Sequence, residues 1–501
     1  MHRICRVVPF LAALLALLLA VSPVAAASPF TPTTGHWVSI DGSVTGSLSG
    51  TSVWIWDTRI GPDGKLYAVG RFDNASGNAT ADNLAFYDTA TKTWKGLGSN
   101  GAGDGALNDA VYAVAWIGTK LYAAGRFTNA GGVAGADHVA VWDGSSWGRV
   151  GPASAFNGQV TGLASSGGLL YAWGMFTDAA SDPTADNIAV WDGASWVGLN
   201  STGALNGAIT GPVWSVSVLA DGELYAAGNF FNDGPDGKCD AVCWWDPASE
   251  SWNPVGGSAA PDNVFNAQAY AVLLVGSKVY VGGVFADAAG NAKADYLAVW
   301  TGKAWTNVGS NGAGAALDGW VYGLRAYGTN IIATGGFTAA GGVTNANKIA
   351  AWNGSKWLAM GAPSSTPAEL FRAMISGRTL YAGGQGPSIT GVAHTNNVAA
   401  FGLPAPPTAP RSPAARSGSH KVTLSWLAPS SNNGGGTPSD YVIQYRKYGT
   451  TTWKTFADGV HTTRSATVTR LTSHSKYQFR VAAKNLWGVG TYSAVITRTA
   501  G

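Results

Sequence analysis

The seven-residue stretch LYAAGRF and its near copies constrain the fold of this chain more than any other feature. LYAVGRF precedes it, LYAWGMF and LYAAGNF follow it, and the phenylalanine that ends the stretch recurs about every 50 residues. This column contains Phe72, Phe127, Phe176, Phe230, Phe285 and Phe337, and a seventh copy, LYAGGQG, has Gly386 in its place. A fixed period of this length is typical of repeat architectures.

Each copy predicts four short β-strands. In the second copy, period-two alternation and glycine-rich breaks place strands at 111–115, 121–127, 139–142 and 147–150. Four antiparallel strands repeated at this period are the sequence signature of a β-propeller. An array of β-sandwiches is the alternative, but a sandwich does not require seven copies of one motif. We therefore predict an all-β protein with a seven-bladed propeller of four-stranded blades at 36–403.

The seventh copy lacks its own fourth strand. Its first three strands are expected at 370–374, 380–384 and 398–401, after which the sequence turns to proline. The stretch HWVSID near the N-terminus supplies the missing strand, because Trp37 matches the tryptophan of the other copies. Those tryptophans are Trp94, Trp147, Trp196, Trp252, Trp305 and Trp357. The N-terminal strand is predicted to complete the last blade and to close the ring, which removes exposed sheet edges.

The order of the recurring residue types within each copy is similar to that of kelch-type propeller repeats. A glycine ends the second strand, an aromatic residue ends the third, and a tryptophan follows the next turn. The pattern resembles most the glycine-rich propeller repeats of secreted bacterial proteins and of fungal cortical polarity markers. It differs from strict kelch repeats because the double glycine is single in four copies: Gly70, Gly125, Gly174 and Gly228.

These columns are expected to have structural roles. The second-strand glycines, with Gly283 in the fifth copy, allow a close approach where a Cβ atom would clash. The tyrosines of the second strand and the tryptophans of the fourth are expected to pack between blades. An acidic column before the third strand is expected to hold loops through backbone N–H groups. Arg71 and Arg126 do not recur, and we expect them on a solvated edge.

A second domain follows a proline-rich linker at 404–411. Residues 412–501 predict a small sandwich of seven short strands, and they resemble a fibronectin type III domain, which has an immunoglobulin-like fold. The resemblance makes Trp426 the core tryptophan of the second strand and pairs Leu471 with Tyr477 in a tyrosine corner, where the hydroxyl bonds to main chain. Such domains commonly act as spacers or adhesive modules.

The N-terminus predicts export. A basic start, a short apolar run and Ala25-Ala26-Ala27 indicate a signal peptide at 1–27, followed by a segment at 28–35. No second long apolar run follows, so we expect a secreted or cell-surface monomer without a membrane span after cleavage. The net charge of +3 gives no support for nucleic-acid binding. Cys239 and Cys243 are a candidate disulfide pair in an oxidising compartment.

Function is expected in the long loops that join second to third strands and successive blades. Antiparallel order places both kinds of loop on one face, around the channel mouth, and such loops usually carry binding sites. The candidate ligand-binding residues are Asn108, Asp109, Asn157, Gln159, Asn266, Gln268, Asp318, Trp320 and Glu369. For any single one of them, a solvated loop end is the simpler interpretation.

The predicted ligand is an extracellular carbohydrate or a protein. A secreted carbohydrate-active enzyme is the alternative, either a glycosidase or lyase using paired carboxylates, or an oxidase of the galactose-oxidase type. No catalytic residue, cofactor or metal is assigned. Asp233, Asp236 and Asp240 in the loop NDGPDGKCD are a weak calcium candidate, and turn formation explains them better.

Overall fold

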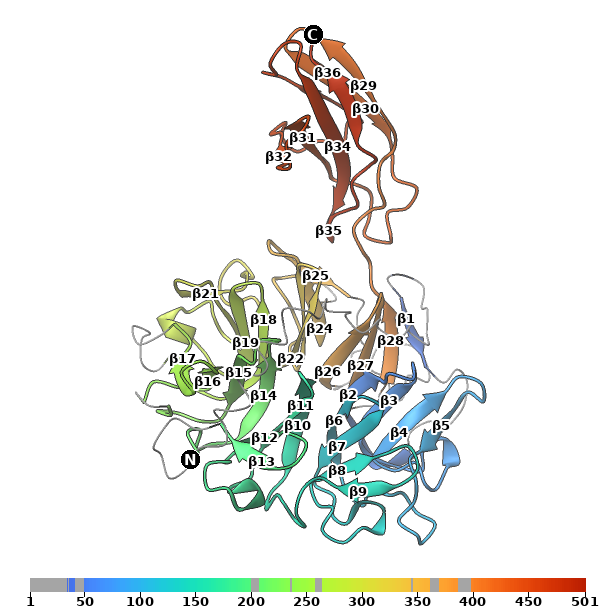
Figure 1. Cartoon of the computed structure of the whole chain (residues 1–501), viewed down its shortest axis with the longest axis vertical. Helices are drawn as coiled ribbons and strands as arrows, with labels where there is room; N and C mark the ends of the chain where they lie inside the picture. The colour runs from blue at the N-terminus through green and yellow to red at the C-terminus, as the bar shows by residue number, and fades with distance from the viewer. Residues whose placement is uncertain are drawn as a thin grey trace.

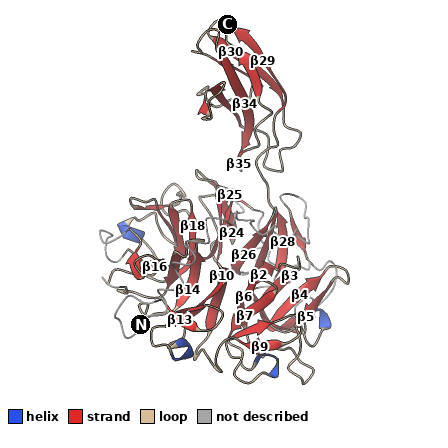
Figure 2. Cartoon of the chain, in the orientation of Figure 1, coloured by secondary structure: helices blue, strands red, loops and turns tan. Residues whose placement is uncertain are grey.

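The computed structural model in Figure 1 describes most of the chain, but not the predicted signal peptide. The described residues are 34, 36–40, 49–199, 207–234, 237–256, 264–343, 346–360, 369–385 and 398–501. Within them the protein is all-β, as predicted, with only short 3-10 turns such as η2 (Ala75–Gly77) between the strands (Figure 2). None of the described helical segments has the length and apolar character needed to cross a bilayer.

The first part of the chain forms seven sets of four antiparallel strands, and the first and last sets are joined into one eight-stranded sheet. We call each set a sheet and number its strands from first to fourth. The first sheet contains β2 (Ser49–Ile60), β3 (Leu66–Asp73), β4 (Leu84–Asp88) and β5 (Thr93–Gly96). The second contains β6 (Val111–Ile117), β7 (Lys120–Gly125), β8 (Val139–Trp142) and β9 (Trp147–Arg149). The third contains β10 (Val160–Ser166), β11 (Leu169–Gly174), β12 (Ile188–Trp191) and β13 (Trp196–Gly198). The four strands predicted in the second copy are thus confirmed to within two residues at each end.

The remaining sheets repeat the same order. The fourth sheet contains β14 (Val213–Val218), β15 (Leu224–Gly228), β16 (Val242–Asp246) and β17 (Ser251–Pro254), and the fifth contains β18 (Ala269–Val275), β19 (Lys278–Gly283), β20 (Leu297–Trp300) and β21 (Trp305–Asn307). The sixth contains β22 (Val321–Tyr327), β23 (Asn330–Gly335), β24 (Ile349–Trp352) and β25 (Trp357–Ala359). The seventh contains β26 (Glu369–Ser376), β27 (Thr379–Gln385), β28 (Val398–Gly402) and β1 (Trp37–Ser39). One bridging pair, Trp54 with Gln385, joins the first and last sheets.

The N-terminal strand is the fourth strand of the last sheet. β1 pairs antiparallel with β28, so that Trp37 lies opposite Phe401, with 4.9 Å between the ring centroids. The same cross-strand aromatic pair occurs in other sheets, for example Trp142 with Trp147 at 5.6 Å. The predicted pairing of the two ends of the repeat region is therefore present.

Neighbouring sheets share their hydrophobic cores. Each of seven buried clusters draws its side chains from two consecutive sheets, and one of them, around Tyr381 and Leu66, joins the last sheet to the first. The first strands lie innermost in Figure 1, and each contacts the first strands of both neighbouring sheets, including β26 with β2. The contacts therefore form a closed cycle.

The fourth-strand tryptophans connect the sheets, as predicted. Trp147 is buried, and its indole N–H donates to the Leu97 carbonyl of the preceding sheet at 2.6 Å. Trp196, Trp252 and Trp357 make the equivalent bond, and Trp37 donates to the Met360 carbonyl at 2.8 Å. Because a buried indole N–H needs an acceptor, this bond fixes five of the sheets against the preceding one. Among the described residues the Trp305 indole has no acceptor.

The C-terminal sandwich packs a three-stranded sheet on a five-stranded one. The strands are β29 (Arg411–Gly418), β30 (Lys421–Leu427) and β33 (Ser465–Val468) in one sheet, and β31 (Asp440–Lys447), β32 (Lys454–Thr455), β34 (Lys476–Asn485), β35 (Gly488–Val489) and β36 (Ile496–Thr499) in the other. Trp426 is buried against Tyr441, and the Thr472 N–H donates to the Tyr477 hydroxyl at 3.1 Å. The predicted tyrosine corner is confirmed.

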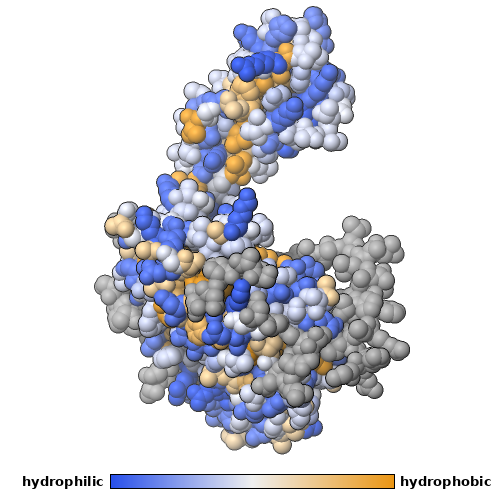
Figure 3. Space-filling view, turned by 90° about the vertical axis from the view of Figure 1, so that its left-hand side faces the viewer, coloured by the Kyte–Doolittle hydropathy of each residue, from blue (hydrophilic) through white to orange (hydrophobic). Residues whose placement is uncertain are grey.

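The sandwich contacts the sheets at their short turns (Figure 3 shows it extending from one side of the molecule). Trp487 is buried, and its ring centroid lies 6.0 Å from that of Tyr327, at the end of β22. The Asn353 amide donates to the Leu486 carbonyl at 2.9 Å, and Arg378 donates to the Asn433 carbonyl at 2.8 Å. Because the first-to-second and third-to-fourth turns lie at the same end of an antiparallel sheet, the long loops emerge at the other end.

Replacing Trp37 by alanine tests the role of the N-terminal strand. Loss of the buried ring and of its bond to Met360 should lower the free energy of unfolding by about 3–5 kcal/mol, measured by urea denaturation. Trp320, whose residue surface is 49% exposed, provides the control: Trp320→Ala should change stability by less than about 0.5 kcal/mol. Equal midpoints for the two variants would contradict a sealing role for β1.

Candidate functional site

The same irregularity occurs in the first strand of every sheet. In each of them the pairing with the second strand shifts by one residue, which is a β-bulge. The bulged residues are Trp56, Tyr112, Thr161, Trp214, Tyr270, Tyr322 and Phe371. A bulge leaves one residue out of the ladder and redirects its side chain. All seven of these residues line one cavity of about 420 Å³.

Six of the seven bulged residues are aromatic, and most of their rings contact one another. Trp56 lies 4.7 Å from Tyr112 between ring centroids, Tyr322 lies 5.7 Å from Phe371, and Tyr270 lies 5.4 Å from Tyr322. Trp54 connects Trp56 to Phe371, at 5.7 and 6.0 Å. We call these residues, together with Trp214, the aromatic arc. It leaves the third sheet open, where Thr161 stands in the aromatic position.

In three sheets the residue two positions before the bulge has a polar side chain: Gln159, Gln268 and Glu369. The Tyr112 hydroxyl donates to Oε1 of Gln159 in the next sheet at 3.1 Å. In the same way, the Trp214 indole N–H donates to Oε1 of Gln268 at 3.2 Å.

Tyr322 continues this pattern in the sixth sheet. Burial raises the pKa of the Tyr322 hydroxyl, as do the charge of Glu369 and the hydrogen bond between the two side chains. Three predicted residues, Gln159, Gln268 and Glu369, are therefore held by aromatic residues that line the cavity.

The second-strand glycines position these mouth residues. A Cβ atom on Gly174 would clash with the carbonyl oxygen of Gln159, and one on Gly283 with that of Gln268. The amide after the glycine donates to the same oxygen, as Met175 does to Gln159 at 2.9 Å. Gly70, Gly125 and Gly228 approach the equivalent carbonyls of Trp54, Ala110 and Pro212. The predicted close approach is thus to backbone, within the same sheet.

Four other candidates anchor loops. Asn157 accepts from the Thr177 N–H at 2.9 Å and donates to its hydroxyl at 2.8 Å. Asn108 does the same with Thr128, Asn266 accepts from the Ala286 N–H, and Asp318 accepts from the backbone of Thr338 and Ala339 and from the Thr338 hydroxyl. Each partner lies in the loop after the second strand, about 20 residues on. These side chains thus have a structural role that the sequence analysis did not assign.

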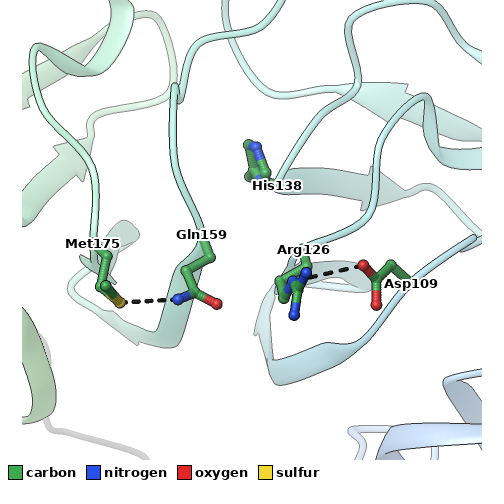
Figure 4. Close-up of a pocket in the computed structure, with 5 residues that line it drawn as sticks. All are labelled: Asp109, Arg126, His138, Gln159 and Met175. Atoms are coloured by element: carbon green, nitrogen blue, oxygen red, sulfur yellow. Dashed lines mark hydrogen bonds and ion pairs between the residues drawn. The ribbon is translucent and has the colours of Figure 1, made fainter.

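Asp109 and the edge arginine Arg126 face each other in a second cavity of about 410 Å³ at the mouth (Figure 4). Arg126 Nε lies 3.6 Å from Oδ2 of Asp109, and Gln159 points to the Met175 sulfur at 2.9 Å. Both charged side chains are about half exposed, so the pair contributes little to stability. Arg126 is solvated, as predicted, but it also belongs to the rim of the mouth.

The acidic column has the predicted structural role. Oδ1 of Asp186 accepts from the Asp178 N–H at 2.7 Å, and Asp82, Asp137, Asp240 and Asp295 accept the equivalent bond. Asp233 is bound to Thr210, and Asp236 of the weak calcium candidate lies outside the described residues. Among the residues described, no group of three His, Cys, Asp or Glu side chains is arranged to hold a metal. Cys239 and Cys243 form a disulfide.

Sequence reasoning missed the aromatic arc, although a signal was present. Aligned on the second-strand glycine, four of the copies read VYAVAW, VWSVSV, AYAVLL and VYGLRA at the first strand, and six of the seven copies have an aromatic residue second. A regular strand would turn that residue onto a sheet face. The bulge sends it into the cavity instead, and the sequence pattern does not reveal the bulge.

Comparison with known proteins identifies the C-terminal sandwich. Residues 406–499 match the fibronectin type III domain family, which confirms the resemblance. Among solved structures, one described as "Myokine structure" is 19% identical, with 19% of this chain and 97% of that chain covered and a TM-score of 0.17. "Titin kinase and its flanking domains" is 26% identical over 19% of this chain, with a TM-score of 0.18. A twitchin kinase region from C. elegans is 25% identical over 18% of this chain, with a TM-score of 0.17. The matches span 17% and 16% of these last two chains.

Replacing Asp318 tests the loop-anchoring role. Asp318→Ala should lower the free energy of unfolding by about 1 kcal/mol, because exposed loop hydrogen bonds contribute modestly. Gln268→Ala, a change at the mouth that removes one bond from the Trp214 indole and leaves the loop bonds intact, should have a smaller effect in the same urea titration. The structural assignment fails if the two variants are equally stable.

The same residue gives a pH dependence. Burial acts to raise the pKa of Asp318, but hydrogen bonds from Thr338 and Ala339 outweigh it and hold that pKa below its usual value. A depressed folded pKa stabilises the protein above the unfolded value of about 3.9, and the effect is lost as pH falls through the folded pKa. The stability gap between the native protein and Asp318→Asn should therefore be constant above about pH 5 and shrink below about pH 4. A gap that widens on acidification would contradict this.

Proposed function

We propose that the seven sheets are the blades of a closed, kelch-like β-propeller at 36–403, completed by β1. The cyclic contacts of the first strands and the seven cores shared by consecutive sheets support this proposal. A row of separate sandwiches would instead enclose one core within each pair of sheets. The cavity lined by all seven first strands is then the central channel.

We propose further that the protein is a secreted, monomeric binding or adhesion protein whose ligand occupies this channel mouth. The aromatic arc is the observation that carries the proposal. All of its aromatic side chains are only partly buried, whereas the fourth-strand tryptophans are buried; the partly buried ones are Trp54, Trp56, Tyr112, Trp214, Tyr270, Tyr322 and Phe371. Flat, partly exposed rings with amide groups beside them suit the apolar faces and hydroxyls of a sugar. A cavity of about 420 Å³ fits a short glycan better than a folded protein.

The fibronectin type III domain fits the role of a spacer or adhesive unit. Its contacts through Trp487, Leu486 and Asn433 lie at the short-turn end of the sheets, away from the mouth. A ligand can therefore enter the channel without meeting the sandwich. This arrangement supports the separation of ligand binding and attachment into two modules.

A carbohydrate-active enzyme is the second candidate, and Glu369 is the observation that favours it. Its carboxylate bonds to Tyr322 at the cavity, whereas Asp109 pairs with Arg126 and Asp318 is held by Thr338. Product release from bound glycans that stops in Glu369→Gln would establish catalysis. Binding without release would leave the binding function.

Alanine substitution in the arc tests the binding proposal. Trp214→Ala and Tyr322→Ala should each weaken glycan binding at least tenfold, or about 1.4 kcal/mol, in array screening followed by calorimetry. Tyr448→Ala, on the exposed surface of the sandwich, is the matched control and should bind as the native protein does. Unchanged affinity in both arc variants would place the site elsewhere.

A further inference from the structure

Charged residues interrupt the repeat at the bottom of the channel. The position after the bulge is occupied by small residues in five sheets: Ala113, Gly162, Ser215, Ala271 and Gly323. In the other two sheets it is Asp57 and Arg372. Two residues further along the strand, Arg59 follows Asp57 in the first sheet and Arg325 follows Gly323 in the sixth. Charges in place of small residues between packed sheets are costly, so they indicate a function rather than packing.

Arg372 closes the cavity beneath the aromatic arc. It follows the bulged Phe371 on β26 and lines the same cavity. Its Nη2 donates to the carbonyl oxygen of Trp214 on β14 at 2.8 Å, so the side chain reaches across the channel. A guanidinium has five N–H donors, and the other donors of Arg372 have no hydrogen bond to a described residue. They remain available to a ligand.

The cluster has more positive than negative charge. Asp57 is fully buried and is bound by Arg59, with Nε to Oδ2 at 2.9 Å, and by the Thr58 N–H. Neither Arg325 nor Arg372 forms an ion pair with a carboxylate of the described residues. Arg325 donates only to the Leu324 carbonyl, at 3.0 Å, within that part of the chain. Among the described residues, Asp57 is therefore the one carboxylate whose charge acts on both guanidinium groups, and it is already bound by Arg59.

The electrostatics of the two arginines agree with this geometry. Burial, together with the positive charge of Arg59, lowers the pKa of Arg325 to about 10. Burial also lowers the pKa of Arg372, although Asp57 opposes the effect. Both side chains stay charged at neutral pH in an environment that disfavours charge. An anion would offset that cost.

We propose that the channel binds an acidic saccharide, with a carboxylate against Arg372 and the sugar ring against the aromatic arc. This inference rests on the proposed binding function and adds the ligand class. Arg binds carboxylates in a planar, two-bond geometry, which makes it the better partner for a uronic acid than for a neutral sugar. Glu369 at the mouth, facing Tyr270 and Tyr322, would repel a second acidic group there and so orient the ligand with its carboxylate inward.

The test compares uronic-acid oligosaccharides with their methyl esters, which keep the sugar and remove the charge. An array of such pairs is probed with the native full-length protein, and hits are titrated by calorimetry. The native protein should bind at least one acid tenfold or more tightly than its ester. Arg372→Met should abolish that preference, and Arg372→Lys should retain part of it. Arg149→Gln, on an exposed position of β9, is the matched control and should behave as the native protein does.

The outcomes separate this inference from the proposed function. Equal binding of acids and esters would overturn the inference and leave the binding function intact. A preference that survives in Arg372→Met would overturn the assignment to Arg372. Binding of none of these glycans would overturn the acidic-saccharide proposal, and binding of neutral glycans that is lost in Trp214→Ala would still support the channel as a site. If Arg372→Met fails to fold, the acid-to-ester ratio of the native protein and the retained preference of Arg372→Lys decide.

Discussion

The close approach of a carbonyl oxygen to a glycine organises each sheet of this protein. The oxygen of a residue near the start of the first strand reaches the backbone at the end of the second strand, where only glycine leaves room, as for Gln159 at Gly174. The amide after the glycine holds that oxygen, and the bulge follows two residues later. One steric requirement therefore fixes where the first strand starts, and with it the direction of the bulged side chain.

Two kinds of position follow from this arrangement. Positions that repeat hold the sheets together: the tryptophan that bonds to the preceding sheet and the acidic side chain that clamps its loop. Positions that differ between copies face the cavity, where Thr161 replaces an aromatic residue and Arg372 replaces a small one. The packing residues repeat from copy to copy because every sheet must pack on an equivalent neighbour. Departures from it are tolerated at the cavity, where no neighbouring sheet has to be matched.

The second module is joined to the first by few but specific contacts. Trp487 belongs to the same buried cluster as Leu370 and Phe401, so the core of the last sheet continues into the sandwich. A guanidinium group, Arg378, bonds to both Leu403 and Asn433 and so spans the junction. These contacts hold the fibronectin type III domain at the short-turn end. The mouth is left to the loops and the aromatic arc.

The sequence by itself determined the number of sheets, their strand boundaries, the pairing of β1 with β28, and the nature of the C-terminal domain. These features depend on local periodicity, on turns and on repeated columns, which a single chain displays directly. Tertiary structure alone decided the site. Sequence alone makes Asn157 and Asp318 candidate ligand-binding residues, but in the structure their side chains bond to the loops that follow the second strands. Sequence alone places Arg126 on a solvated edge, but in the structure it also belongs to the rim of the mouth. The aromatic arc and Arg372 line one cavity only because seven bulges bring side chains from distant copies together. A bulge depends on strand register, and register is a relation between segments that no single segment encodes.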